Sequence, residues 1–511
     1  DVYKRQRIAN FKTASADKDA GAAFLKYKDF KPYVDYFNSM EDENIAQAIP
    51  NARASQWMEE NIPLFECSQK NFEEMYYYRW WTLRKHIKET PVGYGMTEFL
   101  VNRSYADKYN LIACAIGHHI YESRWLRNPE YLNQIIHTWY RGNEGGPMAK
   151  MTKFSSWNAD AVLGRYMVDG NKEFLLDMVK DLEAEYARWE KTNRLPNGLY
   201  WQGDVQDGME ESISGGRRKQ YARPTINSYM YGNAKALSLI GIMTGDEGMA
   251  MKYGLKADSI KTLVQDKLWN TDHHFFETMR GDASAEVREA IGYIPWYFNL
   301  PDASSKYTVA WKEVMDEKGF SAPYGLTTAE RRHPEFRTHG VGKCEWDGAI
   351  WPFASAQTLT AMANFMNNYP QTVLTDSVYF HQMERYVESQ HHRGRPYIGE
   401  YLDEVTGYWL KGDQERSRYY NHSTFNDLMI TGLIGLRPRM DNTVEVNPLI
   451  PEGKWDYFCL DNVLYHGRNL TILWDKDGSR YQRGKGLHIY VDGKEVGHAD
   501  TLTRVLCENV L

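Results

Sequence analysis

Apolar residues recur at three- and four-residue steps in one segment after another between about Glu41 and about Leu436. This spacing places them on one face of an α-helix, so each segment predicts an amphipathic helix that packs against its neighbours. The clearest stripes are Leu175, Met178, Val179, Leu182, Tyr186 and Trp189; Ile226, Tyr229, Met230, Ala234, Leu237 and Ile240; Phe353, Ala356, Leu359, Ala363 and Met366; and Phe425, Leu428, Met429 and Leu433. The repetition predicts a mainly α fold with one large helical domain over residues 41–436.

Long polar segments that carry glycine and tryptophan separate these helices. They span about residues 195–223, 294–339 and 394–422. Loops of this length inside a compact domain are uncommon and usually have a function. Helix pairs joined by long loops on one side indicate a barrel of helical hairpins, with a pocket that the loops build at one end.

The pattern changes to strand-like alternation after the helical region. Residues 443–446, 469–474 and 487–491 read as strands, and the pairs Asp477–Gly478 and Asp492–Gly493 are typical of hairpin turns. We therefore expect a small, sandwich-like antiparallel β domain over residues 437–511. Residues 1–40 remain as an N-terminal extension.

Composition and charge exclude several classes of protein. The net charge of −7 and the absence of a long Lys/Arg run give no electrostatic basis for binding nucleic acid. No run of about 18 apolar residues predicts a membrane span. The first residues have no apolar core typical of a signal peptide, and the N-terminus can be incomplete, so the compartment stays open; we slightly favour a periplasmic or secreted location.

The five cysteines, at positions 67, 114, 344, 459 and 507, are far apart and odd in number. That distribution argues against a disulfide framework and against a zinc cluster. By contrast, the 36 Tyr and 16 Trp are more than core packing asks for, and such rings stack well on sugars. Aromatic contacts between helices explain the same excess equally well.

The first candidate site is an acidic loop that runs from Gly198 to Ser212 and begins with Tyr200 and Trp201. A carboxyl beside aromatic rings loses solvation, which raises its pKa and suits it to act as a general acid. A solvated acidic loop is the plain alternative. The acids of this loop are Asp204, Asp207, Glu210 and Glu211.

The second candidate is Glu400, which lies between Gly399 and Tyr401 in the segment 393–409. Residues 403–407 read as a turn that opens a further loop. A strand-like edge with a surface glutamate is the alternative.

The third candidate is the segment 344–353, in which Trp346 and Trp351 flank Asp347. Two tryptophans around a carboxylate suit a platform for a sugar ring, with the carboxylate holding hydroxyl groups. An N-cap aspartate between two core tryptophans is the alternative.

Taken in order, these segments resemble the inverting glycoside hydrolases of the family 63, mannosylglycerate hydrolase and trehalase type. The matching stretches are residues 207–212, 346–351 and 400–407. Residues 223–231 look like the helix that follows the acid loop in such enzymes, and residues 294–297 and 323–328 look like segments lining the pocket. The resemblance covers roughly residues 75–436. It implies an (α/α)6 barrel, the six-hairpin glycosidase toroid.

The resemblance also assigns roles to residues. It makes Glu210 the general acid and Glu400 the general base, with Asp207 as the alternative acid. The expected sugar-contacting residues are Tyr200, Trp201, Trp346, Asp347, Trp351, Tyr401 and Trp157. The chain departs from the family at Glu210, where an aspartate is usual, at Ala349, where the family has proline, and at Asp347, where it often has arginine. These departures leave the sugar open.

The expected function is an exo-acting, inverting glycosidase that cleaves an α-linked glucoside-like or related oligosaccharide. Its two carboxyls should then stand about 6.5–9.5 Å apart, with room for a water between them and the sugar. The chemistry needs neither a metal nor an organic cofactor. An α-L-rhamnosidase or arabinofuranosidase on the same barrel, a non-catalytic sugar-binding protein and a polysaccharide lyase are the alternatives. The sequence leaves the oligomeric state undetermined.

Overall fold

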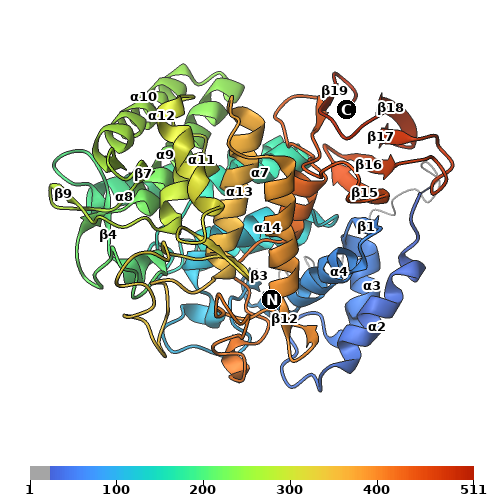
Figure 1. The fold of residues 1–511 in the computed structure, drawn as a ribbon, viewed down its shortest axis with the longest axis horizontal. Helices are drawn as coiled ribbons and strands as arrows, with labels where there is room; N and C mark the ends of the chain where they lie inside the picture. Colours follow the sequence, from blue (N-terminus) through green and yellow to red (C-terminus); the bar gives the residue numbers. More distant parts are fainter. Residues whose placement is uncertain (1–22) are drawn as a thin grey trace.

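The computed structural model describes residues 23–511; its mainly helical part continues into an antiparallel β-sheet at the C-terminal end (Figure 1). The predicted mainly α class with C-terminal strands is therefore confirmed. Of the expected N-terminal extension, residues 1–22 lie outside the described part. The longer helices are α2 (Lys31–Ser39), α3 (Asn51–Asn61), α4 (Lys70–Lys85), α5 (Ile116–Ser123), α6 (Pro129–Arg141), α7 (Asn158–Asp169), α8 (Lys172–Asn193), α9 (Pro224–Thr244), α10 (Glu247–Leu263), α13 (Pro352–Asn368) and α14 (Asp376–Ser389). Three shorter helices are α11 (Ile294–Tyr297), α12 (Ser305–Thr308) and α15 (Asn426–Leu428). A π-helical turn over Met429–Leu433 follows α15 directly.

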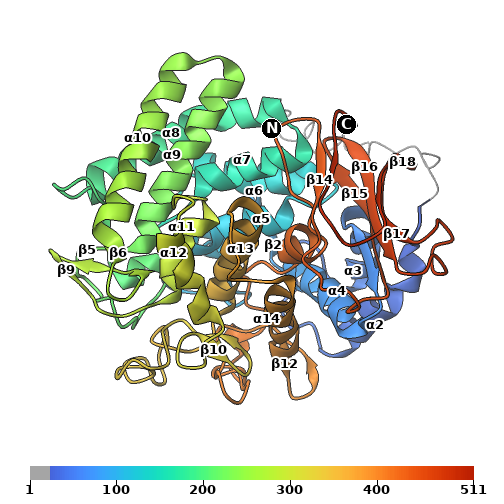
Figure 2. The same cartoon turned by 45° about the horizontal axis from the view of Figure 1, so that its top comes forward.

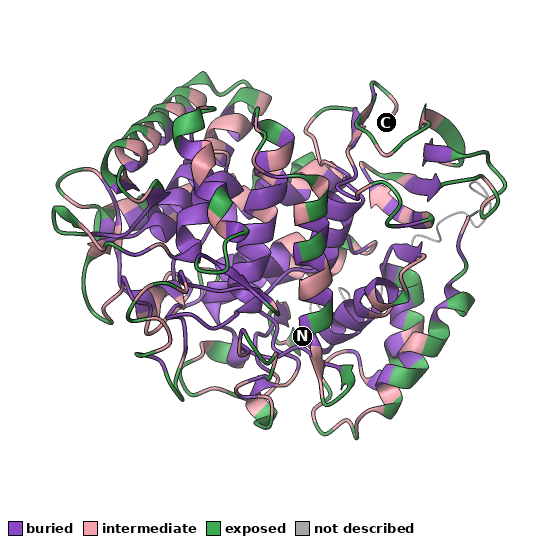
Figure 3. Cartoon of the chain, viewed as in Figure 1, coloured by how far each residue is buried: buried purple, intermediate pink, exposed green. Residues whose placement is uncertain are grey.

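Helices α8 and α9 differ in which of their faces are buried. The stripe of α8 faces inward, and the Asn171 side chain caps its first turn by accepting from the Phe174 N–H at 3.0 Å. Helix α9 is buried on all sides along its first half, as an interior helix should be. Helix α13 is similarly buried (Figure 3). Thus α9 and α13 form the core of the helical part, and α8 and α10 cover α9.

The main sheet has the strand order β1-β15-β16-β17-β18, with every neighbouring pair antiparallel. Its strands are β1 (Leu64–Cys67), β15 (Tyr457–Tyr465), β16 (Arg468–Asp475), β17 (Gly486–Val491) and β18 (Lys494–Ala499). Strand β1 comes from the helical part and pairs Leu64 with Asp461, so it ties that part to the sheet. Two further strands, β14 (Val444–Val446) and β19 (Val505–Cys507), pair with each other.

One of the two predicted hairpin turns is confirmed. Asp492 and Gly493 form the two-residue turn between β17 and β18, and both have the positive φ, 47° and 76°, that such a turn requires. The prediction for Asp477–Gly478 is wrong. Strand β16 ends at Asp475 and β17 begins at Gly486, so this pair lies inside a longer loop.

The segments with the candidate residues lead directly into core helices. Trp157 precedes α7, Arg223 precedes α9 and Trp351 precedes α13. In Figure 2 the loops around β10 (Ser321–Ala322) and β12 (His391–His392) lie at the bottom, away from the upper ends of α9 and α10. Within residues 23–511, no helix has the length and apolar character needed to cross a membrane.

Candidate active site

Glu400 lies in the segment between α14 and α15, and its side chain is almost completely buried. Only 4% of the residue is exposed, and one carboxylate oxygen, Oε2, accepts no hydrogen bond. Two cations approach that oxygen: Lys411 Nζ at 3.8 Å and an Arg416 guanidinium nitrogen at 3.5 Å. A buried carboxylate oxygen without a donor is costly for the fold, and such groups concentrate where chemistry needs them.

The environment of Glu400 acts on its pKa in two directions. Burial raises the pKa, while the charges of Lys411, Arg416 and Arg103 lower it. The net direction is upward. Arg103 belongs to the loop after β3 (Gly93–Met96) and was not among the residues expected from the sequence. The three cations keep an ionised Glu400 available despite its burial.

Glu210 lies in the acid loop, in a tight turn formed by residues with unusual backbone angles. Gly208 and Glu211, on either side, both have positive φ, 71° and 68°. Burial, followed by the charges of Glu400 and Asp204, raises the pKa of Glu210 to about 7, against an N–H hydrogen bond and Arg217, which lower it. The charge of Glu400 therefore reaches Glu210, although the two residues come from loops far apart in the sequence.

Asp207, the alternative acid, is engaged on both oxygens. Its Oδ2 accepts from Arg223 Nε at 2.6 Å and from the Thr225 hydroxyl, and its Oδ1 accepts from the Ser155 hydroxyl at 2.5 Å. The Asp207 and Arg223 side chains are fully buried. This pair fastens the acid loop to the start of α9. Such an arrangement favours Glu210, whose carboxyl is not held in an ion pair, as the acid.

Substituting Asp207 tests this anchoring role. Removing one partner of a buried ion pair leaves the other charge unpaired, so Asp207→Asn should lower the free energy of unfolding by about 3–5 kcal/mol. Urea unfolding followed by circular dichroism measures the change. Asp441→Asn, which breaks an exposed pair with Arg439, is the matched control and should cost less than about 1 kcal/mol. Unchanged stability together with lost activity would instead favour Asp207 as the acid.

Glu98 is a third carboxyl at the site, and the sequence analysis missed it. It is 3% exposed, and burial, together with the charges of Glu400 and Glu210, raises its pKa to about 7. Tyr420 and Cys114 oppose this shift by donating hydrogen bonds, the thiol from 3.1 Å. Cys114 also lies beneath the acid loop at Gly208. No motif surrounds Glu98, so only the tertiary structure indicates it.

Three aromatic rings form a continuous stack beside Glu400. The ring centroids of Trp346 and Trp351 are 4.5 Å apart at 20°, and those of Trp351 and Tyr401 are 4.5 Å apart at 17°. All three residues are buried. The Trp351 indole N–H donates to the Glu345 carbonyl, and the Tyr401 hydroxyl donates to the Lys343 carbonyl. The stack thus fixes the residue next to Glu400 through Tyr401.

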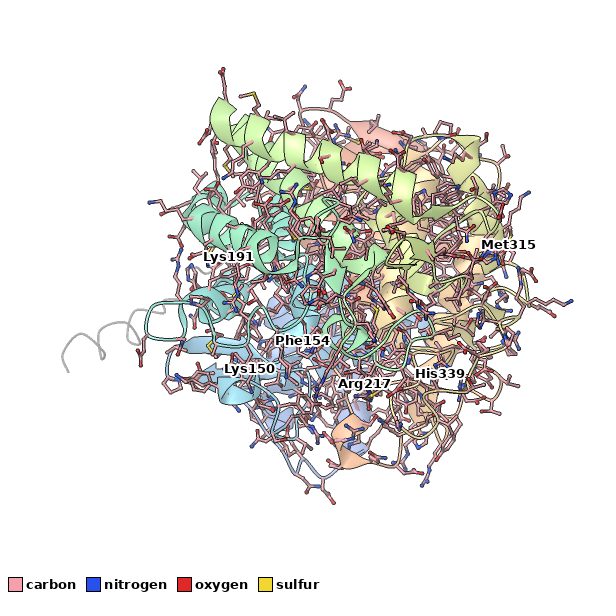
Figure 4. All side chains as sticks on the ribbon, turned by 90° about the vertical axis from the view of Figure 1, so that its left-hand side faces the viewer. Lys150, Phe154, Lys191, Arg217, Met315 and His339 are labelled. Carbon is pink, nitrogen blue, oxygen red and sulfur yellow. The ribbon has the colours of Figure 1, made fainter. Side chains whose placement is uncertain are left out.

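Asp347 holds the loop before this stack. Its Oδ2 accepts from the backbone N–H groups of His339 and Gly340 at 2.6 and 3.0 Å, and its buried Oδ1 has no partner. The N-cap alternative for Asp347 is wrong, because α13 begins at Pro352 and Trp351 occupies its N-cap position. Figure 4 labels Phe154, Arg217 and His339 on one side of the molecule. Arg217 donates to Glu211 and the His339 N–H to Asp347, while Phe154 precedes Ser155, which donates to Asp207.

The three remaining residues expected to contact the sugar lie in different surroundings. Trp157 is buried beside the acid-loop anchor, with its ring 4.8 Å from that of Tyr229 and directly over Gly117, where a Cβ would lie 2.1 Å from the indole. Tyr200 turns the other way, since its hydroxyl lies 3.5 Å from Glu190 Oε1 of α8. Trp201 is half-buried in the short strand β4 (Trp201–Gln202). The structure therefore does not bring Tyr200 to the two carboxyls.

One group of side chains in residues 23–511 has the spacing of a metal site. His273 lies 2.6 Å from Glu277 and 3.4 Å from Glu286, in the turns and connections between the short strands that follow α10. Glu277 also accepts from Asn270 and Ser284. Hydrogen bonding accounts for this cluster, which shares no contact with Glu210 or Glu400.

Comparison with known families defines the class of this protein. A family model described as the mannosylglycerate hydrolase MGH1-like glycoside hydrolase domain matches residues 108–423, and one described as the glycosyl hydrolase family 65 C-terminal domain matches residues 436–498. Both matched families are glycoside hydrolase families. More particularly, the protein belongs to the MGH1-like glycoside hydrolase family, because the first match covers more than half of the chain.

Solved structures give two kinds of likeness. A protein named "Sialidase" is 83% identical over 98% of this chain with a TM-score of 0.96, and the chain spans 46% of that protein's length. The family 63 mannosylglycerate hydrolase from Thermus thermophilus, in complex with glucose, is 11% identical with a TM-score of 0.53, over 70% of this chain and 99% of that one. The α-L-rhamnosidase from Dictyoglumus thermophilum is 12% identical with a TM-score of 0.52, over 86% and 45%. The last two likenesses concern the fold alone.

Proposed function

We propose that this protein is an exo-acting, inverting glycosidase in which Glu210 is the general acid and Glu400 the general base. The observation that carries the proposal is the electrostatic interaction between these two buried carboxyls, of which Glu400 also lies within 4 Å of Lys411 and Arg416. A pKa of about 7 leaves about half of the Glu210 carboxyls protonated at neutral pH, whereas at Glu400 three cations oppose the rise in pKa that burial causes. Such a difference between paired carboxyls supports the assignment of one as acid and the other as base.

Each carboxyl then has one proton to move. Glu210 donates its proton to the glycosidic oxygen as the bond to the anomeric carbon breaks. Glu400 takes a proton from a water that attacks the same carbon from the opposite face, which inverts its configuration. The partner-free Glu400 Oε2 is the oxygen available to that water.

We further propose that the helical part is an (α/α)6 barrel. The core helices contact one another in the order α5, α7, α9, α11, α13 and α15, and α15 contacts α5 again. That closed order supports a ring of six inner helices, with α8, α10, α14 and α4 outside it. We place the barrel at residues 41–436 and the β domain at 437–511; the separate family matches on either side of residue 436 support this boundary.

The substrate we favour is an α-linked glucoside-like or related oligosaccharide. The stack of Trp346, Trp351 and Tyr401 beside Glu400 supports a site for a sugar ring. Asp347, Trp157 and Trp201 remain proposed contacts, and Tyr200 is the least supported of them because it faces α8.

A sugar that carries a carboxylate is the second candidate. The observation that favours it is the cluster of Arg103, Lys411 and Arg416 around Glu400, which can also hold an acidic substrate. The name of the 83% identical relative agrees with this alternative. Rates on 4-nitrophenyl α-glucoside, α-mannoside and α-L-rhamnoside, set against 4-methylumbelliferyl N-acetylneuraminic acid, separate the two candidates.

The proposed mechanism is tested by following the anomeric proton by NMR during hydrolysis of the preferred glycan. We expect the first product to appear with the configuration opposite to that of the substrate. A product that retains its configuration contradicts the inverting mechanism. Ultraviolet absorption by a new double bond would identify a lyase instead.

A further inference from the structure

A cavity among the core helices shares no lining residue with the candidate active site. Its volume is about 360 Å³, within the range of about 300–1,000 Å³ typical of small-molecule sites. Residues of α7, α9 and α13 line it, from Asp160 in the first turn of α7 to Leu239 and Asn368 in the last turns of α9 and α13. The loops with the candidate catalytic residues precede the first turns of these helices. The two sites therefore share helices but no residues.

The cavity contains two cations without carboxylate partners. Neither Lys235 nor Arg437 forms an ion pair with any carboxylate in the described residues 23–511. The Arg437 guanidinium donates only to the Asn364 side chain at 2.7 Å and the Thr431 carbonyl at 3.1 Å. Burial lowers the pKa of both cations. Asp160 acts on Lys235, and Glu445 and Asp427 act on Arg437, only from beyond ion-pair distance. Because direct pairing is what offsets the cost of burying a charge, an anionic ligand in contact with both cations would stabilise them.

The other polar groups of the cavity are suited to hydroxyl groups. Asp160 accepts one hydrogen bond, from Tyr121 at 2.6 Å, which leaves its Oδ1 free of protein donors. Asp427 accepts hydrogen bonds from Arg124 and Trp125 on Oδ1 alone, so its Oδ2 also has no protein donor. A carboxylate oxygen is a strong acceptor for a ligand hydroxyl.

Aromatic rings form part of the wall. Tyr121 and Tyr297 meet edge to face with centroids 5.9 Å apart, and Phe298 follows Tyr297 at 4.7 Å. Rings of this kind pack against the apolar face of a sugar. The cavity thus combines flat apolar surface, acceptors for hydroxyls and unpaired positive charge.

We propose that this cavity is a second binding site, for a monosaccharide-sized sugar that carries a carboxylate. The carboxylate of the ligand pairs with Lys235 and Arg437, and its ring hydroxyls donate hydrogen bonds to Asp160 and Asp427. The site is separate from the catalytic carboxyls, and the proposal does not depend on the proposed mechanism.

Isothermal titration calorimetry of the whole protein with glucuronate and with glucose tests the proposal. Glucuronate should bind at least about tenfold more tightly than glucose, because charge-assisted hydrogen bonds add to the shared hydroxyl contacts. Lys235→Met should reduce glucuronate affinity to the level of glucose. Lys191→Met, on the exposed surface of α8 and labelled in Figure 4, should leave it unchanged.

The controls separate this site from the catalytic one. Lys235 has no carboxylate partner to lose, so Lys235→Met should fold normally and hydrolyse the preferred aryl glycoside at the wild-type rate within about twofold. Equal affinities for the two sugars, or no binding of glucuronate at concentrations up to about 10 mM, would overturn the proposal. So would binding that survives Lys235→Met but disappears in Arg416→Met, because that result places glucuronate beside Glu400.

Discussion

Glu400→Gln is expected to lower kcat by about 10²–10⁴-fold, the usual contribution of a positioned general base. Glutamine keeps the shape of the side chain but cannot accept the proton of the attacking water. The effect should fall on kcat, because the aromatic stack that we propose supports the sugar ring does not include the carboxylate. Initial rates on the preferred aryl glycoside, together with calorimetric affinity for an uncleaved analogue, measure both quantities.

The matched control for Glu400→Gln is Glu415→Gln, which changes an exposed glutamate of the same loop. Its activity should stay within about twofold of wild type. Azide added to Glu400→Ala supplies a small anion in place of the missing carboxylate and should restore part of the rate with an inverted glycosyl azide as product. Full activity of Glu400→Gln would remove Glu400 from the mechanism, and unchanged sugar affinity without any wild-type hydrolysis would indicate a binding protein.

Glu210→Gln should have the second large effect, and its size should depend on the leaving group. A general acid matters most when the departing alkoxide is strongly basic, so hydrolysis of a natural oligosaccharide should fall by about 10²–10⁴-fold. A 2,4-dinitrophenyl glycoside, whose leaving group needs little protonation, should lose far less. Comparing kcat/KM on the two substrates measures the difference. An equal loss on both would contradict the acid role.

The pH profile should change in the same variant. Because the proposed acid Glu210 would act in its protonated form, wild-type activity should fall as the pH rises through the pKa of about 7. Glu400 acts in its ionised form, so activity should also fall as the pH drops through its raised pKa. Glu210→Gln should abolish the alkaline fall and keep the acidic one. Glu211→Gln, in which the neighbouring exposed pair with Arg217 is broken, should retain both limbs.

Local patterns in the sequence were sufficient for much of the secondary structure. The stripe from Leu175 to Trp189 predicted α8, and alternation with a favourable Asp–Gly turn predicted the β17–β18 hairpin. These elements depend on residues close in sequence, whose periodicity fixes the buried face. The pair Asp477–Gly478 failed because a turn-forming dipeptide does not determine the length of its loop.

The residues of the candidate site could be predicted from the sequence only in part. The order of the motifs along the chain was enough to indicate Glu210, Glu400 and the Trp346–Trp351 segment. Glu98 and Arg103 carried no signal, because their importance comes from the charges placed around them by folding. Tyr200 shared a loop with the acid but points to Glu190, since neighbours in an extended segment face opposite ways.

Spacing along the chain was enough to predict the main helical segments and the strands β14, β16 and β17, because each of them depends on residues close in sequence. The glycoside hydrolase motifs were indicated by their resemblance to a known family. Tertiary folding was needed to bring the carboxyls together, to pair Asp207 with Arg223 and to add β1 to the C-terminal sheet. It also formed the charged cavity around Lys235. These features arise from burial and charge between distant residues, and both are set by the packing of the whole fold.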